Sequence, residues 1–168
     1  GDCKSTCNHE PGIRTSIYTN EQLNALLNSG LRIERLYVPA DLFYLKQADI
    51  DKVISKGKEE GMEIYLSMPR IVRAKDEAYL SFVKAIMNTF DGILVKNLET
   101  LYFLQMEEYQ GRIDTDFMLY NWNKSALGFL DGFRDGFTYP LELSLREIKE
   151  LGNRNGEYVV YGRTPMMV

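Results

Sequence analysis

The fold is indicated by one stretch of the chain, Asp91-Gly92-Ile93-Leu94-Val95-Lys96-Asn97-Leu98. Its centre, Gly92 to Val95, is a short apolar run of the kind that forms a strand buried inside a parallel sheet. A helical pattern precedes it, with apolar residues three and four positions apart from Tyr79 to Phe90. Asn97 is a suitable N-cap for the apolar helical pattern that follows. The stretch therefore predicts a buried strand between two helices.

The same alternation runs along the rest of the chain. β-Branched and aromatic runs predict seven strands, at residues 14–18, 33–38, 62–68, 92–95, 113–119, 136–139 and 157–161. Helical patterns lie between them, and two open with capping boxes, Thr19 with Gln22 and Ser144 with Glu147. The connection through residues 39–43 is expected to be a loop.

Strands that alternate with helices predict a parallel sheet with right-handed crossovers, in which all seven strands are neighbours. Either a TIM-barrel-like (β/α) repeat or an open parallel α/β sheet satisfies this pattern. With seven strands, a barrel would be incomplete or degenerate. We expect residues 1–12 to be a flexible leader and residues 13–168 to be a single domain, excised from a longer protein.

Composition narrows the class of protein. The 168 residues are 45% hydrophobic and 26% charged, which is typical of a soluble globular domain. The net charge of -4 argues against a free-standing nucleic-acid binder, which usually presents a basic face. No apolar run approaches the ~20 residues of a membrane span, so no membrane contact is expected. Two cysteines, Cys3 and Cys7, are too few for a disulfide scaffold and favour a cytoplasmic location.

The inventory of reactive side chains excludes several mechanisms. His9 is the only histidine, so a Ser-His-Asp or Cys-His triad inside the domain is excluded. Cys3, Cys7 and His9 could ligate a metal, but a structural site needs four ligands, so a leader without metal is the preferred interpretation. The sequence contains neither a Gly-x-Gly-x-x-Gly motif nor a P-loop, so nothing indicates nucleotide binding.

Four segments carry a family resemblance, and they occur in order along the chain. Asp91–Leu98 resembles the D-G-hydrophobic-V-R-N-L stretch of the peptidase U32 (collagenase-like protease) family, with Lys96 in place of Arg. Asp116–Asn123 is similar to the family's D-Y-S-L-N-V-F-N stretch, with Tyr120 in place of the inner Asn. The elements at residues 142–151 and 162–167 are similar to its Glu-Leu-Asn/Ser and Gly-Arg-x-Pro-Met elements.

The resemblance implies a TIM-like barrel and a hydrolase of the peptidase class. It also implies an alternative, because some members of the family look like iron-sulfur-dependent hydroxylating enzymes that act on RNA or a quinone precursor. Their cluster would be held elsewhere in the full-length protein, and we expect no cofactor or metal in this chain. The partners implied are the remaining domains of the parent chain and an RNA or peptide substrate.

Polar residues at the expected carboxyl ends of the strands are the site candidates, because ligands of parallel α/β folds bind at that edge. The resemblance implies catalytic candidates at Arg163, Glu142 and Asp116. The substrate-binding candidates are Lys96, Asn97, Arg70 and Asn123. The same residues have structural interpretations, since Asn97 and Asn123 are N-cap candidates and Asp116 could be a strand-end carboxylate bound by backbone amides. If they form a site, Arg70, Lys96, Asp116, Glu142 and Arg163 should converge.

Two functional classes remain open. In the first, the chain is a domain of a U32-type enzyme and is itself inactive, because the sequence supports no protease mechanism. In the second, it is a non-catalytic barrel that serves as a scaffold or holds a substrate for the rest of the protein.

Overall fold

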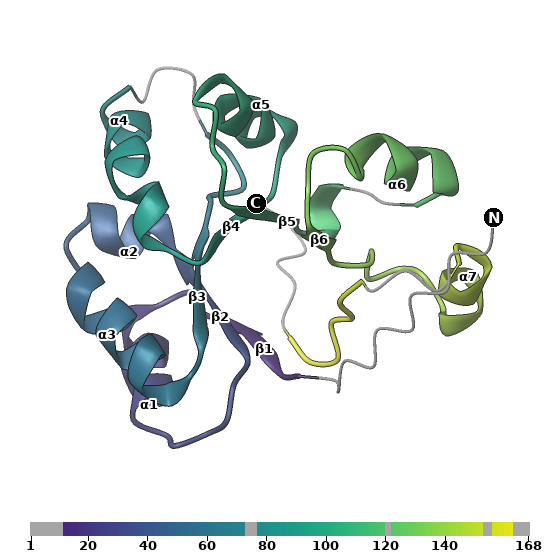
Figure 1. Cartoon of the computed structure of the whole chain (residues 1–168). Coiled ribbons are helices and arrows are strands. Elements are labelled where there is room, and N and C mark those ends of the chain that lie inside the picture. Colours follow the sequence, from purple (N-terminus) through teal and green to yellow (C-terminus); the bar gives the residue numbers. More distant parts are fainter. Residues whose placement is uncertain (1–11, 73–76, 120–121, 153–155, 163–168) are drawn as a thin grey trace.

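The structure, a computed structural model, describes residues 12–72, 77–119, 122–152 and 156–162. Strands and helices alternate along it (Figure 1). The strands are β1 (Arg14–Ser16), β2 (Arg35–Pro39), β3 (Glu63–Ser67), β4 (Gly92–Val95), β5 (Arg112–Thr115) and β6 (Gly136–Phe137). The α-helices are α1 (Asn20–Leu27), α2 (Ala40–Tyr44), α3 (Ile50–Glu60), α4 (Glu77–Ile86), α5 (Leu98–Met106), α6 (Lys124–Leu130) and α7 (Leu145–Glu150). Two short 3-10 helices are η1 (Met87–Thr89) and η2 (Phe117–Leu119).

Within the described residues, six strands form one sheet in the order β1-β2-β3-β4-β5-β6, and every neighbouring pair is parallel. Each new strand is added on the same side of the previous one. With right-handed crossovers, this order puts all the connecting helices on one face of the sheet. A doubly wound sheet instead reverses its strand order and carries helices on both faces. The predicted parallel (β/α) repeat is therefore confirmed, and its strand order is that of a TIM-like barrel.

The sheet curls toward its inner face. If it were flat, six strands about 4.8 Å apart would leave β1 about 24 Å from β6. Instead, Arg14 of β1 forms an ion pair with Glu157, a residue that pairs in parallel with Thr138 just after β6. That contact requires the two edges of the sheet to approach each other, so the strands form an incomplete barrel. Figure 1 shows α1 to α5 arranged around the outside of β1 to β5, with α6 and α7 beyond β6.

The main core lies between the outer face of the sheet and these helices. Apolar residues at alternate positions of β2, β3 and β4 face the helices and are buried; they are Leu36, Val38, Ile64, Leu66, Ile93 and Val95. Each contributes roughly 1.5–3 kcal/mol relative to an exposed side chain. A smaller core joins α6, α7 and β6 through Leu127, Phe137, Tyr139 and Ile148.

The inner face carries the other alternate positions, and these are mostly polar. In β2 they are Arg35 and Tyr37, in β3 Glu63 and Tyr65, and in β5 Asp114. The period-two pattern thus gives β2 and β3 one apolar and one polar face, whereas the inner side of β4 carries Gly92 and Leu94. The polar face is the one on which a site can be built.

Helix boundaries follow the predicted capping signals. Both capping boxes are present, Thr19 with Gln22 and Ser144 with Glu147. Gly61 ends α3 in the left-handed conformation, with φ of 64°, which a residue without Cβ adopts at little cost. Residues 1–11 of the predicted leader lie outside the described residues.

One predicted loop is wrong. Residues 39–43 were expected to be a loop, but Ala40–Tyr44 form the short helix α2. Leu42 and Phe43 are buried, and Phe43 packs against Phe90 with ring centroids 5.4 Å apart. Pro39 immediately precedes the first helical residue, and tertiary packing of two apolar side chains then favours the helix over a loop.

The seventh predicted strand is also wrong beyond its first residue. Glu157 forms a single parallel bridge with Thr138, and the following residues are not in a strand. Val160 and Tyr161 are 94% and 93% exposed, although the sequence pattern indicated burial. Tyr158 instead stacks on Tyr139, with ring centroids 4.9 Å apart. β-Propensity mostly reflects packing against neighbours, and these residues have no strand or helix beside them in the described part of the chain.

One further boundary differs from the prediction. The fifth strand, expected at 113–119, ends at Thr115, and Phe117–Leu119 form η2.

No helix among the described residues is long and apolar enough to span a membrane.

Candidate functional site

Two of the predicted site residues, Lys96 and Asp116, come together at the carboxyl edge of the inner face. The pairing of β4 with β5 aligns Val95 with Thr115, so the next residues, Lys96 and Asp116, are neighbours across the two strands. The Asp116 N–H donates to the Val95 carbonyl over 2.8 Å, which extends the ladder by one residue. Lys96 lies two positions after the inward-facing Leu94, and Asp116 lies two positions after the inward-facing Asp114. Because side chains alternate along a strand, both side chains lie on the inner face.

Asp116 is the more enclosed of the two, with 8% of its surface exposed. The backbone N–H groups of Met118 and Phe117, at the start of η2, lie close enough to its carboxylate to favour the charged form and so lower its pKa. Its Oδ1 atom is buried and has no hydrogen-bond partner in the described part of the chain. Burial raises the pKa of Asp116, and the charge of Lys96 only partly offsets that effect. One oxygen is thus unsatisfied, which favours a ligand that donates a hydrogen bond.

Lys96 is partly buried and lies within electrostatic reach of two carboxylates. Burial lowers the pKa of Lys96, while the negative charges of Asp116 and of Asp41, which begins α2 after β2, act in the opposite direction. Among the described residues Lys96 forms no ion pair within 4.0 Å. Its ammonium group is therefore held near negative charge without being paired to it.

Tyr18 lies at the same edge, two residues beyond β1, and the site prediction did not include it. Its side chain is 64% exposed. Burial of part of the ring and the charge of Asp116 both raise the pKa of Tyr18, so its hydroxyl remains a proton donor at neutral pH. β1 pairs only with β2 in the described sheet, so this proximity to Asp116 results from the curl.

Asn97 and Arg70 lie together just outside this pair. Asn97 Oδ1 accepts the Thr100 N–H over 2.7 Å, which makes Asn97 the N-cap of α5. Its Nδ2 donates to the carbonyls of Pro69 (3.2 Å) and Arg70 (3.0 Å). Asn97 therefore fixes the segment after β3 against α5, and the exposed Arg70 side chain is carried by that segment.

The remaining candidates are placed differently. Asn123 caps α6, with its Oδ1 atom 2.9 Å from the Ala126 nitrogen, and is exposed. Glu142 is exposed in the turn before α7, and no contact joins it to Lys96 or Asp116 in the described part of the chain. Arg163 lies outside the described residues. The predicted convergence is thus seen for Lys96 and Asp116, while the roles of the other candidates stay predictions.

A second polar group lies deeper on the inner face, and the sequence interpretation missed it. Arg35 is 2% exposed and forms ion pairs with Asp114 and with Glu63, the latter over 2.6 Å. Its guanidinium carbon also lies 4.0 Å above the Tyr65 ring. Burial opposes the Arg35 charge, but the neighbouring carboxylates more than offset this and raise its pKa.

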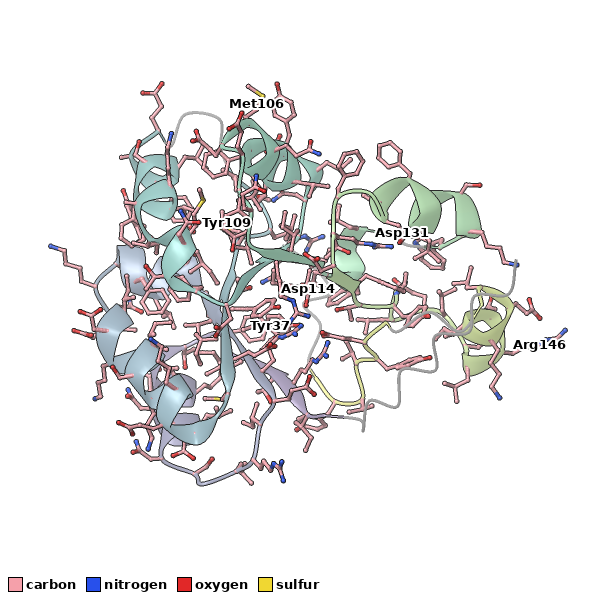
Figure 2. All side chains as sticks on the ribbon, in the orientation of Figure 1. Tyr37, Met106, Tyr109, Asp114, Asp131 and Arg146 are labelled. Atoms are coloured by element: carbon pink, nitrogen blue, oxygen red, sulfur yellow. The ribbon has the colours of Figure 1, made fainter. Side chains whose placement is uncertain are left out.

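Tyr37 and Glu157 complete this interior network, defined here as Arg14, Arg35, Tyr37, Glu63, Asp114 and Glu157. The Tyr37 hydroxyl donates to Glu157 over 2.6 Å and lies 3.3 Å from Asp114 Oδ2. Tyr37 was not among the predicted site residues. The available signal was the alternation of polar with apolar residues in β2 and β3. Figure 2 shows Tyr37 and Asp114 directed toward one another from the sheet interior.

The described residues include no group of three or more His, Cys, Asp or Glu side chains placed to hold a metal ion. Cys3, Cys7 and His9 lie outside the described residues. The rim itself offers an amine, a buried carboxylate and a phenol, which can bind a polar ligand and transfer protons.

The sequence matches no protein-family model and no curated protein. Two solved structures are similar in fold. One, described as an uncharacterized B. cereus protein, shares 17% sequence identity with a TM-score of 0.48 over 87% of this chain and 46% of its own. The other, D-psicose 3-epimerase with D-tagatose from Clostridium cellulolyticum H10, shares 9% identity with a TM-score of 0.44 over 88% of this chain and 83% of its own. This chain thus spans less than half the length of the first.

Proposed function

We propose that this chain is a domain of a U32-type, collagenase-like peptidase and that it holds the substrate rather than cutting it. The observation that carries the proposal is the placement of Lys96 beside Asp116 on the inner face, where the Asp116 Oδ1 atom is buried without a partner among the described residues. A peptide backbone presents N–H donors and carbonyl acceptors, which suit this carboxylate and this ammonium group. The family assignment itself is supported by the motifs that contain these two residues.

The proposal includes the setting of the domain. We place it in the cytoplasm, as part of a longer protein whose other domains cleave the substrate. Any iron-sulfur cluster would be bound by those other domains, because a [4Fe-4S] cluster usually takes four cysteines and this chain contains two. The net charge of -4 favours a peptide over RNA as the substrate held here.

Fluorescence anisotropy of the purified chain, with a labelled gelatin-derived peptide and with a single-stranded RNA of equal length, tests this. We expect peptide binding that Lys96→Gln weakens about tenfold, since a hydrogen bond to a charged group is worth about 1.5–3 kcal/mol. The matched control is Lys84→Gln on the outer face of α4, where Lys84 pairs with Glu107. Binding of RNA alone would favour the hydroxylating enzyme, and binding of neither would overturn the substrate-holding role.

A further inference from the structure

We propose that Lys96 is an amine nucleophile that forms an imine with a small aldehyde or ketone at the carboxyl edge of the sheet. The inference deepens the proposed function, because it assigns covalent chemistry to the same rim pair. It rests on where the backbone places Lys96 and Asp116, and on what surrounds the two side chains.

The position of Lys96 is set by the sheet rather than by a loop. Lys96 follows the last residue of β4. The strands on both sides of β4, which are β3 and β5, hold β4 in register. The amine thus extends from a rigid strand end toward the concave face, where a ligand of a parallel α/β fold binds. A nucleophile must be held in this way to meet a carbonyl carbon repeatedly in the same geometry.

The surroundings of Lys96 favour its neutral form more than those of a surface lysine do. Its side chain is partly buried against the sheet, and no carboxylate lies within 4.0 Å of its nitrogen among the described residues. Burial also lowers its pKa, with Asp116 and Asp41 opposing the shift from a greater distance. A desolvated lysine of this kind has a larger fraction of free amine, which is the form that attacks a carbonyl group.

Asp116 supplies the proton transfers that the reaction needs. Its Oδ1 atom is buried and without a partner in the described part of the chain, while backbone N–H groups of η2 hold the carboxylate in place. Burial raises the pKa of Asp116 above its ordinary value, which makes the carboxylate a stronger proton acceptor. The strand register places it beside Lys96.

The chemical step balances without any oxidant or reductant. The Lys96 nitrogen attacks the carbonyl carbon, a C–N bond forms, and the carbonyl oxygen becomes a hydroxyl as Asp116 relays one proton from nitrogen to oxygen. Asp116 then takes the second proton from nitrogen and gives it to the hydroxyl, which leaves as water while the C=N bond forms. Both amine hydrogens and the carbonyl oxygen thus leave in one water molecule.

Reductive trapping of the full chain tests the proposal directly. The protein is treated with propionaldehyde and sodium cyanoborohydride at neutral pH, and labelling is followed residue by residue by mass spectrometry. We expect Lys96 to be alkylated at least about fivefold faster than the exposed Lys52 of α3, because activation by desolvation outweighs the partial burial. Labelling of Lys96 at or below the rate of Lys52 would overturn the inference.

Two variants sharpen the result. Asp41→Asn removes a negative charge that favours the ammonium form, so labelling of Lys96 should become faster. Asp51→Asn, an exposed residue in the first turn of α3, should leave the rate unchanged. Equal rates in both variants would contradict an electrostatically tuned amine. Selective labelling without peptide binding would overturn only the substrate-holding proposal, and peptide binding without selective labelling would overturn only this one.

Discussion

The Tyr37 hydroxyl lies 2.6 Å from Glu157, a hydrogen bond between residues 120 positions apart in the sequence. Tyr37 belongs to β2, whereas Glu157 follows α7 and pairs beside β6, so the bond crosses the interior of the curled sheet. Arg14 and Arg35 contact the same carboxylate, Arg35 at 3.6 Å. The incomplete barrel is therefore held across its interior by side chains, at a place where a complete barrel would have further strands.

Removing Arg35 should destabilise the fold strongly. Arg35→Met leaves the buried Asp114 without its cation, and breaking a buried ion pair in this way costs about 3–5 kcal/mol. The partly buried Glu63 also loses Arg35 but keeps its pair with Arg112. Urea unfolding followed by circular dichroism measures the loss. Arg146→Met is the matched control, because Arg146 and Glu150 form an exposed pair on α7, for which a change below about 1 kcal/mol is expected.

The double variant Arg35→Met/Asp114→Leu distinguishes an unpaired charge from lost packing. If the cost of Arg35→Met arises from the orphaned carboxylate, removing Asp114 as well should recover part of it. Simple addition of the two single losses would contradict an energetic coupling between these residues.

Gly136 and Gly128 should respond in opposite directions to substitution by alanine. A Cβ on Gly136 would lie 2.6 Å from Asp114 Oδ1, and that carboxylate is fixed by Arg35. We therefore expect Gly136→Ala to lower the free energy of unfolding by about 1–3 kcal/mol. Gly128 lies in α6, and a Cβ added there would meet no neighbouring atom of the described chain within 4 Å. Gly128→Ala should therefore raise the free energy of unfolding by up to about 1 kcal/mol. Thermal unfolding of both variants provides the comparison, and loss of stability in both would contradict it.

The repeat of strand and helix could be predicted because each of the first six units carries its own local signals. Thr19, Asp49, Asn97, Asn123 and Ser144 all cap helices as their side chains indicate. The strands of β2 to β4 were recognisable from their buried apolar residues. The parallel arrangement then follows from the length of the crossovers.

The barrel interior could not be predicted in the same way, because its contacts join residues far apart in the chain. Arg35 meets Asp114 across 79 positions, and neither residue carries a local signal for the other. The strand predicted after Glu157 was wrong for a related reason. The apolar residues of this segment have high β-propensity, but propensity does not supply a neighbouring strand. The site pair Lys96 and Asp116 was partly predictable, since both follow strands, but their register is a tertiary property.

Asn97 should matter more for stability than Asn123, although both are N-caps. Asn97→Ala removes the cap of α5 and also two hydrogen bonds to the carbonyls of Pro69 and Arg70. Asn123→Ala removes one cap bond at an exposed helix start. A cap alone is worth about 1 kcal/mol, and each further hydrogen bond adds about 0.5–1.5 kcal/mol. Urea unfolding should therefore show the larger loss for Asn97→Ala, and equal losses would mean that its amide group does not stabilise the segment after β3.

Asp116 should make the folded chain less stable as the pH rises. Its pKa in the folded state is raised above the ordinary value of 3.8, chiefly by burial, with Glu157 adding to the shift and Lys96 opposing it. The folded state therefore binds the proton more tightly than the unfolded state does. Because proton binding and folding are linked, the free energy of unfolding should fall as the pH increases. The fall begins near the ordinary pKa of a carboxyl group and ends above the raised pKa of Asp116 in the folded state.

Asp116→Asn removes this ionisation while keeping an oxygen that can accept the N–H groups of Phe117 and Met118. The variant should gain stability relative to the wild type as the pH rises from about 4 to about 7, since only the wild type must ionise a buried carboxyl group. Urea unfolding at several pH values within that range measures the difference. Asp51→Asn is the control, because it makes the same substitution at an exposed carboxyl group in the first turn of α3. If the Asp116→Asn and wild-type curves stay parallel across the range, the carboxyl group is ionised at no cost. The unpartnered oxygen would then be solvated, and Asp116 could not act as the enclosed proton-transfer group beside Lys96.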